Sequence, residues 1–213
     1  MNSKKGILFD LDGTLWDATV QIAASWKKVI DSFHFVNKTL TVAEIKSCMG
    51  LPMDQIFRRL FPNLQQHDRD ALQAKCQQYE NAYLASHPGC LYLQVRQTLE
   101  QLKGKGFHLF IVTNAQSGYI EAFFSATNLQ DLFDDYEMFG RTGLLKSENI
   151  KLVRKRNALD GAAYVGDTQQ DYLACVDANI PFIHAAYGFG NAEKAVYRLP
   201  SFAQLPDMID KVI

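Results

Sequence analysis

Short apolar runs alternate with amphipathic segments along most of the chain. Four runs have strand character, with a weaker fifth: residues 7–9, 107–113, 162–165 and 181–186, then 136–139. Each is too short and too apolar for a half-exposed helix. After residue 90, helical periodicity separates these runs at 91–102, 119–128, 147–157 and 172–178. This alternation predicts parallel βαβ units and therefore an α/β fold.

Residues 18–86 have a different pattern, because apolar side chains recur there at helical spacing and no convincing strand appears. The segment from Thr41 to Glu44 fits a helix capping box. Near the end of the block, Leu72, Cys76, Tyr79 and Tyr83 continue with a period near four. We therefore expect an all-helical insert directly after the first strand of the α/β domain, with His87-Pro88-Gly89 as the return linker.

Composition excludes several classes of protein. The chain has 213 residues, with 22 basic and 23 acidic side chains, so its net charge of −1 does not point to nucleic acid or an anionic membrane as a partner. The four cysteines form no CxxC pair, which leaves zinc and thioredoxin-like sites unsupported. The N-terminus resembles neither a signal peptide nor a membrane span, so we expect a cytoplasmic protein. The oligomeric state is left open.

Polar residues follow three of the predicted strands. Asp10 and Asp12 come after the run that ends at Phe9, Thr113-Asn114 end the second run, and Gly166-Asp167 follow the third. In a parallel α/β sheet, ligands bind in the crevice at the carboxyl ends of the strands. If these strands are neighbours, their polar ends converge on one crevice.

The first of these segments, FDLDGT from Phe9 to Thr14, resembles the first motif of the haloacid dehalogenase-like superfamily, in its phosphatase branch. Gly166 to Asp171 read GDTQQD, which resembles the fourth motif, GDxxxD. The resemblance covers nearly the whole chain. It implies a doubly wound, Rossmann-like parallel sheet as the core, formed by residues 1–17 and 87–213. It also implies that residues 18–86 are the family's helical cap.

The resemblance also implies roles for the nucleophile and its neighbours. Asp10 would attack phosphorus and form an aspartyl-phosphate, while Asp12 would act as general acid and base. Thr113, with Asn114, would hydrogen-bond the phosphoryl oxygens. Lys146 would be the lysine of the third motif, and its positive charge would offset the negative charges of Asp10 and the phosphate. The family often has a proline after this lysine, whereas Ser147 follows here.

A Mg²⁺ site is implied by the same motifs. Its ligands would be Asp10, the backbone carbonyl of Asp12, and Asp167. Asp171 would orient the lysine or a metal-bound water, with a plain first-turn helix acid as the less favoured alternative. The remaining basic residues near Lys146 are interpreted as a solvated face: Lys151, Arg154, Lys155 and Arg156.

Other segments of the chain do not match a known functional motif. The histidines lack HExxH spacing, Gly143 to Ser147 is too short for a Walker A loop, and Ser117 lacks a GxSxG elbow. Gly188-Phe189-Gly190 is interpreted as a turn that lines the crevice. The aromatic side chains of Trp16, Trp26 and Phe33 are interpreted as packing rather than as a ligand box.

These features predict a Mg²⁺-dependent phosphatase of small phosphomonoesters, most similar to the phosphoglycolate-phosphatase-like group. A phosphomutase of the β-phosphoglucomutase type is the main alternative. Such mutases tend to have a cap arginine after a glycine, whereas Gly50 is followed by Leu51-Pro52-Met53 here, and Arg58 and Arg59 come later. A haloacid dehalogenase needs neither Asp12 nor Asp167. A non-catalytic binding module is the remaining alternative.

Overall fold

The computed structural model describes residues 3–213 and contains a six-stranded sheet in which all pairings are parallel. Its order is β5-β4-β1-β6-β7-β8, with β1 at Lys5–Phe9, β4 at His108–Thr113, β5 at Asp135–Met138, β6 at Gly161–Gly166, β7 at Phe182–Ala185 and β8 at Tyr197–Leu199. Ile7 pairs with Leu109 on one side and Ala163 on the other. The predicted α/β fold with a parallel core sheet is thereby confirmed.

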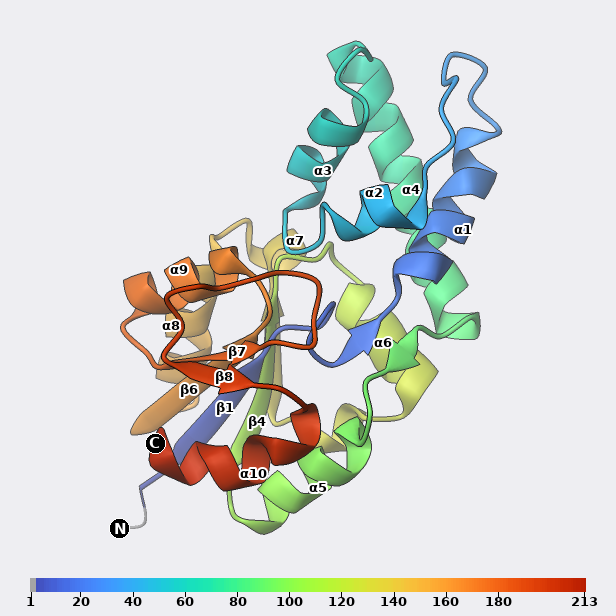
Figure 1. The fold of residues 1–213 in the computed structure, drawn as a ribbon. Helices are drawn as coiled ribbons and strands as arrows, with labels where there is room; N and C mark the ends of the chain where they lie inside the picture. Colours follow the sequence, from blue (N-terminus) through green and yellow to red (C-terminus); the bar gives the residue numbers. More distant parts are fainter. Residues whose placement is uncertain (1–2) are drawn as a thin grey trace.

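Helices cover both faces of this sheet (Figure 1). They are α5 (Val95–Gly104), α6 (Tyr119–Thr127), α7 (Phe139–Thr142), α8 (Lys146–Arg156), α9 (Gln169–Ala178) and α10 (Leu205–Met208), with short 3₁₀ turns at Gln130–Leu132, Phe202–Gln204 and Ile209–Lys211. Alternate residues of β1 point to opposite faces. Ile7 and Phe9 enter the larger apolar cluster, which includes residues of α5 and α6, whereas Leu8 enters the cluster below α8 and α9. The first strand is therefore buried on both sides.

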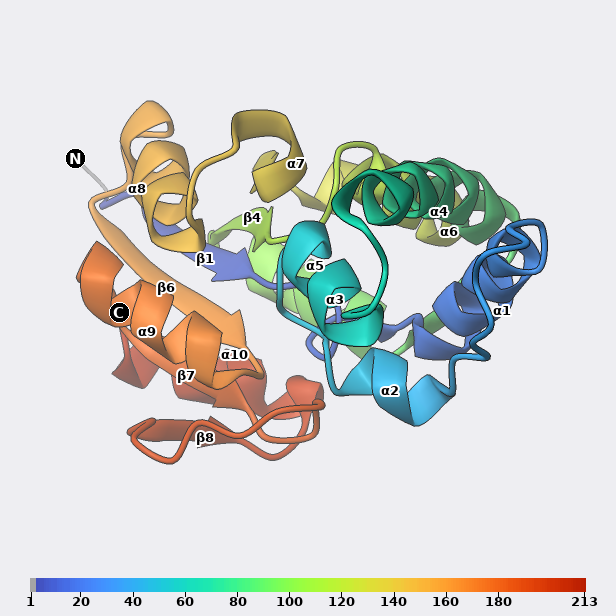
Figure 2. The same cartoon turned by 90° about the horizontal axis from the view of Figure 1, so that it is seen from above.

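Four helices occupy residues 19–86, and we call them the cap: α1 (Thr19–Ile30), α2 (Val42–Lys46), α3 (Met53–Leu60) and α4 (Gln66–Ser86). They gather at one end of the core in Figure 1, and α4 lies alongside α6 (Figure 2). The predicted capping box at Thr41 and Glu44 is present. Within residues 3–213, no helix has the length and apolar character needed to cross a bilayer.

A two-stranded ribbon joins the cap to the core. It consists of β2 (Trp16–Asp17) and β3 (Cys90–Leu91), which pair antiparallel with Trp16 opposite Leu91. The helix expected from residue 91 therefore begins only at Val95. Leu91, the first residue of the expected helix, pairs with Trp16 in this ribbon instead. Helical periodicity in the sequence does not reveal such pairing.

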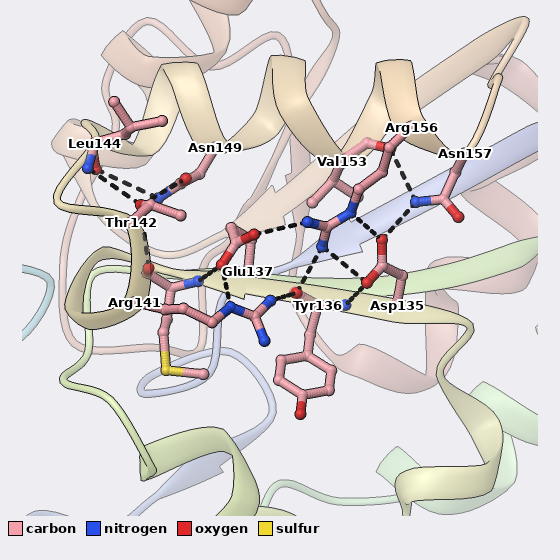
Figure 3. Close-up of polar contacts among 11 residues, drawn as sticks. Asp135, Tyr136, Glu137, Arg141, Thr142, Leu144, Asn149, Val153, Arg156 and Asn157 are labelled. Carbon is pink, nitrogen blue, oxygen red and sulfur yellow. Dashed lines mark hydrogen bonds and ion pairs between the residues drawn. The ribbon is translucent and has the colours of Figure 1, made fainter.

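A polar network anchors α8 to β5 (Figure 3). Arg156 donates to Asp135 through Nε (2.5 Å) and Nη2 (2.8 Å), and to Glu137 Oε2 through Nη1 (2.7 Å). Arg141 Nε donates to Glu137 Oε1 (2.7 Å), so two arginines share this buried carboxylate. Arg156 is exposed, as expected for a solvated face, but its guanidinium also clamps the strand, which the sequence did not indicate.

The other end of α8 is fixed by the turn that precedes it. Thr142 Oγ1 donates to Asn149 Oδ1 (2.9 Å), and Asn149 Nδ2 donates to the carbonyl of Leu144 (3.3 Å), as Figure 3 shows. These bonds hold the turn against the helix. Since α8 begins at Lys146, both networks fix the position of that lysine relative to the sheet.

Candidate active site

The loop after β1 begins with Asp10, whose backbone N–H donates to the carbonyl of Val165 in β6 (2.9 Å). This bond continues the sheet by one residue and leaves the Asp10 side chain at the carboxyl end of the central strand. The chain then turns at Gly13, where φ is +83° and a Cβ would lie 2.2 Å from Asp167 Oδ2. Only glycine satisfies both constraints.

Three buried carboxylates meet at this end of the sheet. Oxygens of Asp10, Asp167 and Asp171 lie within 4.8 Å of one another. The buried ammonium of Lys146 joins two of them: its Nζ is 3.1 Å from Asp10 Oδ1 and 2.5 Å from Asp171 Oδ1. Three acids thus face one lysine, which leaves an excess of negative charge.

Burial and mutual repulsion shift the acidities of this cluster. Burial raises the pKa of Asp10 to about 6, although Lys146 acts to lower it. Burial, together with Asp171 and Asp10, raises the pKa of Asp167 to about 8. Burial alone would lower the pKa of Lys146, but the carboxylates of Asp10 and Asp171 raise it above its ordinary value. The lysine therefore stays charged, and the acids are short of positive charge.

The donor set fits a hard divalent cation. Within the described range, Asp167 Oδ1 is buried and has no partner, and Asp10 Oδ1 is buried with no partner other than the Lys146 ammonium. The other oxygen of Asp167 is fixed by the backbone N–H groups of Phe189 (2.8 Å) and Gly190 (3.2 Å). Buried carboxylate oxygens with too few partners are costly, and a cation such as Mg²⁺ would supply the missing partner. The turn at Gly188 to Gly190 therefore supports this site.

Asp171 is bound differently from the other two acids. Its Oδ1 accepts from Lys146, and its Oδ2 accepts from the backbone N–H (3.0 Å) and hydroxyl (2.7 Å) of Thr168. The Thr168 hydroxyl accepts in turn from the Asp171 N–H, which completes a capping box for α9. Both carboxylate oxygens are thus engaged, so the contacts of Asp171 are those of a residue that orients Lys146 while it caps a helix.

Asp12 faces the pocket from the same loop. The hydroxyl of Tyr119 at the start of α6 donates to Asp12 Oδ1 (2.9 Å). Burial raises the pKa of Asp12 well above its usual range, although this hydrogen bond acts to lower it. Tyr119 was not singled out from the sequence, because it lies in an apolar helix whose pattern predicts only core packing. The tyrosine orients one oxygen of Asp12 and leaves the other for the pocket.

The second core strand ends at Thr113, which is buried beside this cluster and lines the same pocket as Asp10 and Asp12. Its hydroxyl accepts weakly from the Ala115 N–H (3.4 Å) and has room to donate. Asn114 also lines the pocket, but its Nδ2 donates to the carbonyl of Gly50 in the cap (2.8 Å). In this arrangement the Asn114 amide joins cap to core.

The pocket has a cavity volume of about 40 Å³ and lies between Asp10 and the cap. Its far wall includes the apolar side chains of Ile22, Met53 and Ile56, with one buried acid, Glu80 of α4. Glu80 Oε1 accepts from Gln116 Nε2 (2.7 Å), and Oε2 accepts from the indole N–H of Trp26. Burial raises the pKa of Glu80 to about 7.

Sequence reasoning missed Glu80, although a signal was present. The buried positions of α4 are Leu72, Cys76, Glu80 and Leu84, four residues apart, whereas Tyr79 is 39% exposed. The expected continuation through Tyr79 and Tyr83 follows the wrong face of the helix. A carboxylate that interrupts an apolar stripe could have marked this residue. Trp26 is packed against Phe57, with ring centroids 5.0 Å apart, and it also contributes to the pocket.

The fold and this acid cluster define an α/β protein with a carboxylate site at the carboxyl ends of its parallel strands, and the comparisons give its family. The family model described as "Haloacid dehalogenase-like hydrolase" matches residues 7–185. The chain therefore belongs to the haloacid dehalogenase-like hydrolase family.

Relatives in this family span nearly the whole chain. A phosphoglycolate phosphatase of Colwellia psychrerythraea is 23% identical and covers 91% of this chain and 89% of its own length. One from Vibrio cholerae is 26% identical, with coverage of 95% and 93%. Among solved structures, a haloacid dehalogenase-like hydrolase of Streptococcus pneumoniae has a TM-score of 0.83 and 20% identity, covering 98% of this chain and 100% of its own. That structural similarity shows the fold.

Proposed function

We propose that this chain is a Mg²⁺-dependent phosphatase that hydrolyses small phosphomonoesters through an aspartyl-phosphate on Asp10. The chain is a phosphoric monoester hydrolase, as its curated relatives indicate. The observation that carries the rest of the proposal is the unpartnered carboxylate oxygen of Asp167, buried beside Asp10, whose Oδ1 has no partner other than the Lys146 ammonium. A nucleophilic carboxylate next to a cation site is what attack on an anionic phosphate requires.

In this proposal, Asp10, the carbonyl of Asp12 and Asp167 hold the metal. A bound Mg²⁺ supplies positive charge that lessens the repulsion between the nucleophile and the phosphate. Lys146 adds a second fixed positive charge, and its ion pair with Asp171 keeps it aimed at Asp10. Thr113 donates its hydroxyl to a phosphoryl oxygen. These groups bind and orient the phosphate.

Asp12 transfers the protons in this reaction. Its raised pKa favours the protonated form closer to neutral pH, so it can protonate the leaving oxygen while Asp10 attacks phosphorus. The deprotonated Asp12 then takes a proton from the water that hydrolyses the aspartyl-phosphate. Tyr119 keeps the carboxyl oriented through both steps.

The alternatives are less well supported by the pocket. A mutase must hold a second phosphate, but Arg58 and Arg59 are exposed on α3 and neither lines the pocket beside Asp10. Arg58 instead approaches Asp54 on its own helix (3.5 Å). A dehalogenase releases halide without protonation and needs neither Asp12 nor a cation site. We therefore propose the phosphatase alone.

The test is phosphate release from a panel of small phosphoesters, with Mg²⁺ and after its removal with EDTA. We expect release to require Mg²⁺ and to fall at least about a thousandfold in Asp10→Asn, because the amide cannot form the acyl phosphate. Asp131→Asn, at an exposed position, is the matched control. Activity retained by Asp10→Asn would remove Asp10 as the nucleophile.

A further inference from the structure

The wall of the pocket opposite Asp10 carries an acid and no base. Across residues 3–213, no lysine, arginine or histidine lines this pocket, whereas Asp10, Asp12 and Glu80 all do. Lys146, the nearest ammonium, is engaged by Asp10 and Asp171 at the phosphate end. Whatever part of a substrate extends from the phosphate toward the cap therefore meets apolar side chains and the carboxyl group of Glu80.

Glu80 is held in place with acceptor capacity to spare. Its two oxygens accept one hydrogen bond each, from Gln116 and Trp26, whereas a carboxylate can accept about four. Only 2% of the residue is exposed, so solvent does not screen it. Gln116 also donates to Asn81 Oδ1 (3.1 Å), which ties the acid to the loop that follows Thr113. A ligand group that donates a hydrogen bond would be stabilised at Glu80.

An anionic group would meet the opposite situation. A carboxylate that enters this pocket finds two further acids, Asp12 and Glu80, and no positive partner, so it would lose its hydration without compensation. Binding of 2-phosphoglycolate would create this situation, because its leaving group ends in a carboxylate. The curated relatives carry that substrate in their names, yet the pocket of this chain does not offer the cation that such a leaving group needs.

We propose that the leaving group accepted by this site ends in a hydrogen-bond donor, a hydroxyl or a protonated amine, and that Glu80 selects against leaving groups that end in a carboxylate. This inference rests on the proposed phosphatase function and narrows its substrate class. The predicted substrates are monophosphates of polyols or amino alcohols. The binding energy comes from hydrogen bonds to Glu80 and from apolar contact with the cap.

Three two-carbon esters of nearly equal size test the proposal: 2-phosphoglycolate, 2-hydroxyethyl phosphate and ethanolamine phosphate. They differ in the terminal group, which is anionic, neutral or cationic. For the wild-type enzyme with Mg²⁺, we expect kcat/KM for the hydroxyl or the amine ester to exceed that for 2-phosphoglycolate at least tenfold. The hydroxyl and amine arms show which donor is preferred.

The variant Glu80→Gln removes the charge with little change of shape. We expect it to reduce the preference against 2-phosphoglycolate at least fivefold, and Glu100→Gln, on the exposed face of α5, to leave the ratio unchanged. A ratio of kcat/KM values does not depend on the fraction of folded enzyme, so a structural effect alone would not move it. Equal or better hydrolysis of 2-phosphoglycolate by the wild type, or an unchanged ratio in Glu80→Gln, would overturn the inference.

Hydrolysis of p-nitrophenyl phosphate distinguishes an error in the role of Glu80 from an error in the proposed phosphatase function. If the folded wild type releases phosphate from p-nitrophenyl phosphate but prefers neither donor-bearing ester, the phosphatase stands and the role of Glu80 is wrong. If no ester is hydrolysed, including p-nitrophenyl phosphate, the phosphatase proposal itself fails.

Discussion

Two acids one residue apart in the sequence, Asp10 and Asp12, have different partners in the same site. Asp10 faces the Lys146 ammonium, whereas Asp12 accepts from a phenol and lies near Glu80 without a cation. The first environment favours a carboxylate, and the second favours a protonated carboxyl. This difference is what a nucleophile and a general acid need.

We expect Asp12→Ala to lower kcat/KM for alkyl phosphates by about a hundredfold or more, since a positioned general acid contributes about that factor. The loss for p-nitrophenyl phosphate should be under tenfold when p-nitrophenol release is measured, because that leaving group departs without a proton. Asp131→Ala serves as the control for an exposed acid. An equal loss across both leaving groups would show that Asp12 does not protonate the leaving oxygen.

Individual residues of the site could be predicted from the sequence to different degrees. Thr113 ends a strand, and three acids come just after strands: Asp10, Asp12 and Asp167. Sheet geometry alone brings strand ends together. Glu80 comes from an insert whose position over the sheet is not encoded by a short motif. Tyr119 lies in an apolar helix, so its hydroxyl is visible as a partner of Asp12 only after folding.

At the scale of secondary structure, the link between α8 and β5 depends on one guanidinium. Arg156→Ala should lower the free energy of unfolding by about 2 kcal/mol, because it leaves Asp135 and the buried Glu137 with fewer donors. Arg156→Lys should retain only part of the lost free energy of unfolding, since lysine lacks the planar guanidinium that donates paired hydrogen bonds. Urea unfolding measures the change. Lys155→Ala is the exposed control, and an equal loss in that variant would contradict the clamp.

Most core strands were predicted to within about a residue, because they are buried and apolar. The exception is β8, Tyr197–Leu199, which is short and includes an exposed arginine. It forms by pairing with β7, where Ile183 lies opposite Tyr197. The two strands of the ribbon, β2 and β3, were missed for the same reason. Each has two residues and forms only by pairing with the other. Pairing across the chain leaves no periodic signal in so short a segment.

At the scale of the whole molecule, a few hydrogen bonds beside the pocket join the cap to the core, in addition to apolar packing between α4 and α6. Asn81 Nδ2 donates to the Ser117 carbonyl (2.8 Å), and Asn81 Oδ1 accepts from Gln116. A Cβ at Gly118 would lie 2.7 Å from Asn81 Nδ2, so the contact is close. These bonds stabilise the arrangement in which the cap covers Asp10 and keeps water away from it.

Asn81→Ala should weaken this arrangement by about 1 kcal/mol, which corresponds to about a fivefold rise in KM for small phosphoesters. Thermal stability should change little, because Asn81 is only partly buried. Steady-state kinetics and a thermal melt measure both quantities, with Gln78→Ala, one turn earlier and exposed, as the control. An unchanged KM would mean that other contacts hold the cap in place.

The ribbon formed by β2 and β3 brings both ends of the cap to one place. Because Trp16 lies opposite Leu91, the chain leaves the core and returns to it side by side. One uninterrupted stretch of the gene thus encodes the cap, and exchanging that stretch would cut no strand of the six-stranded sheet. A different cap can therefore replace this one through one crossover at each end of the stretch, and Asp10 and the other residues at the strand ends stay unchanged.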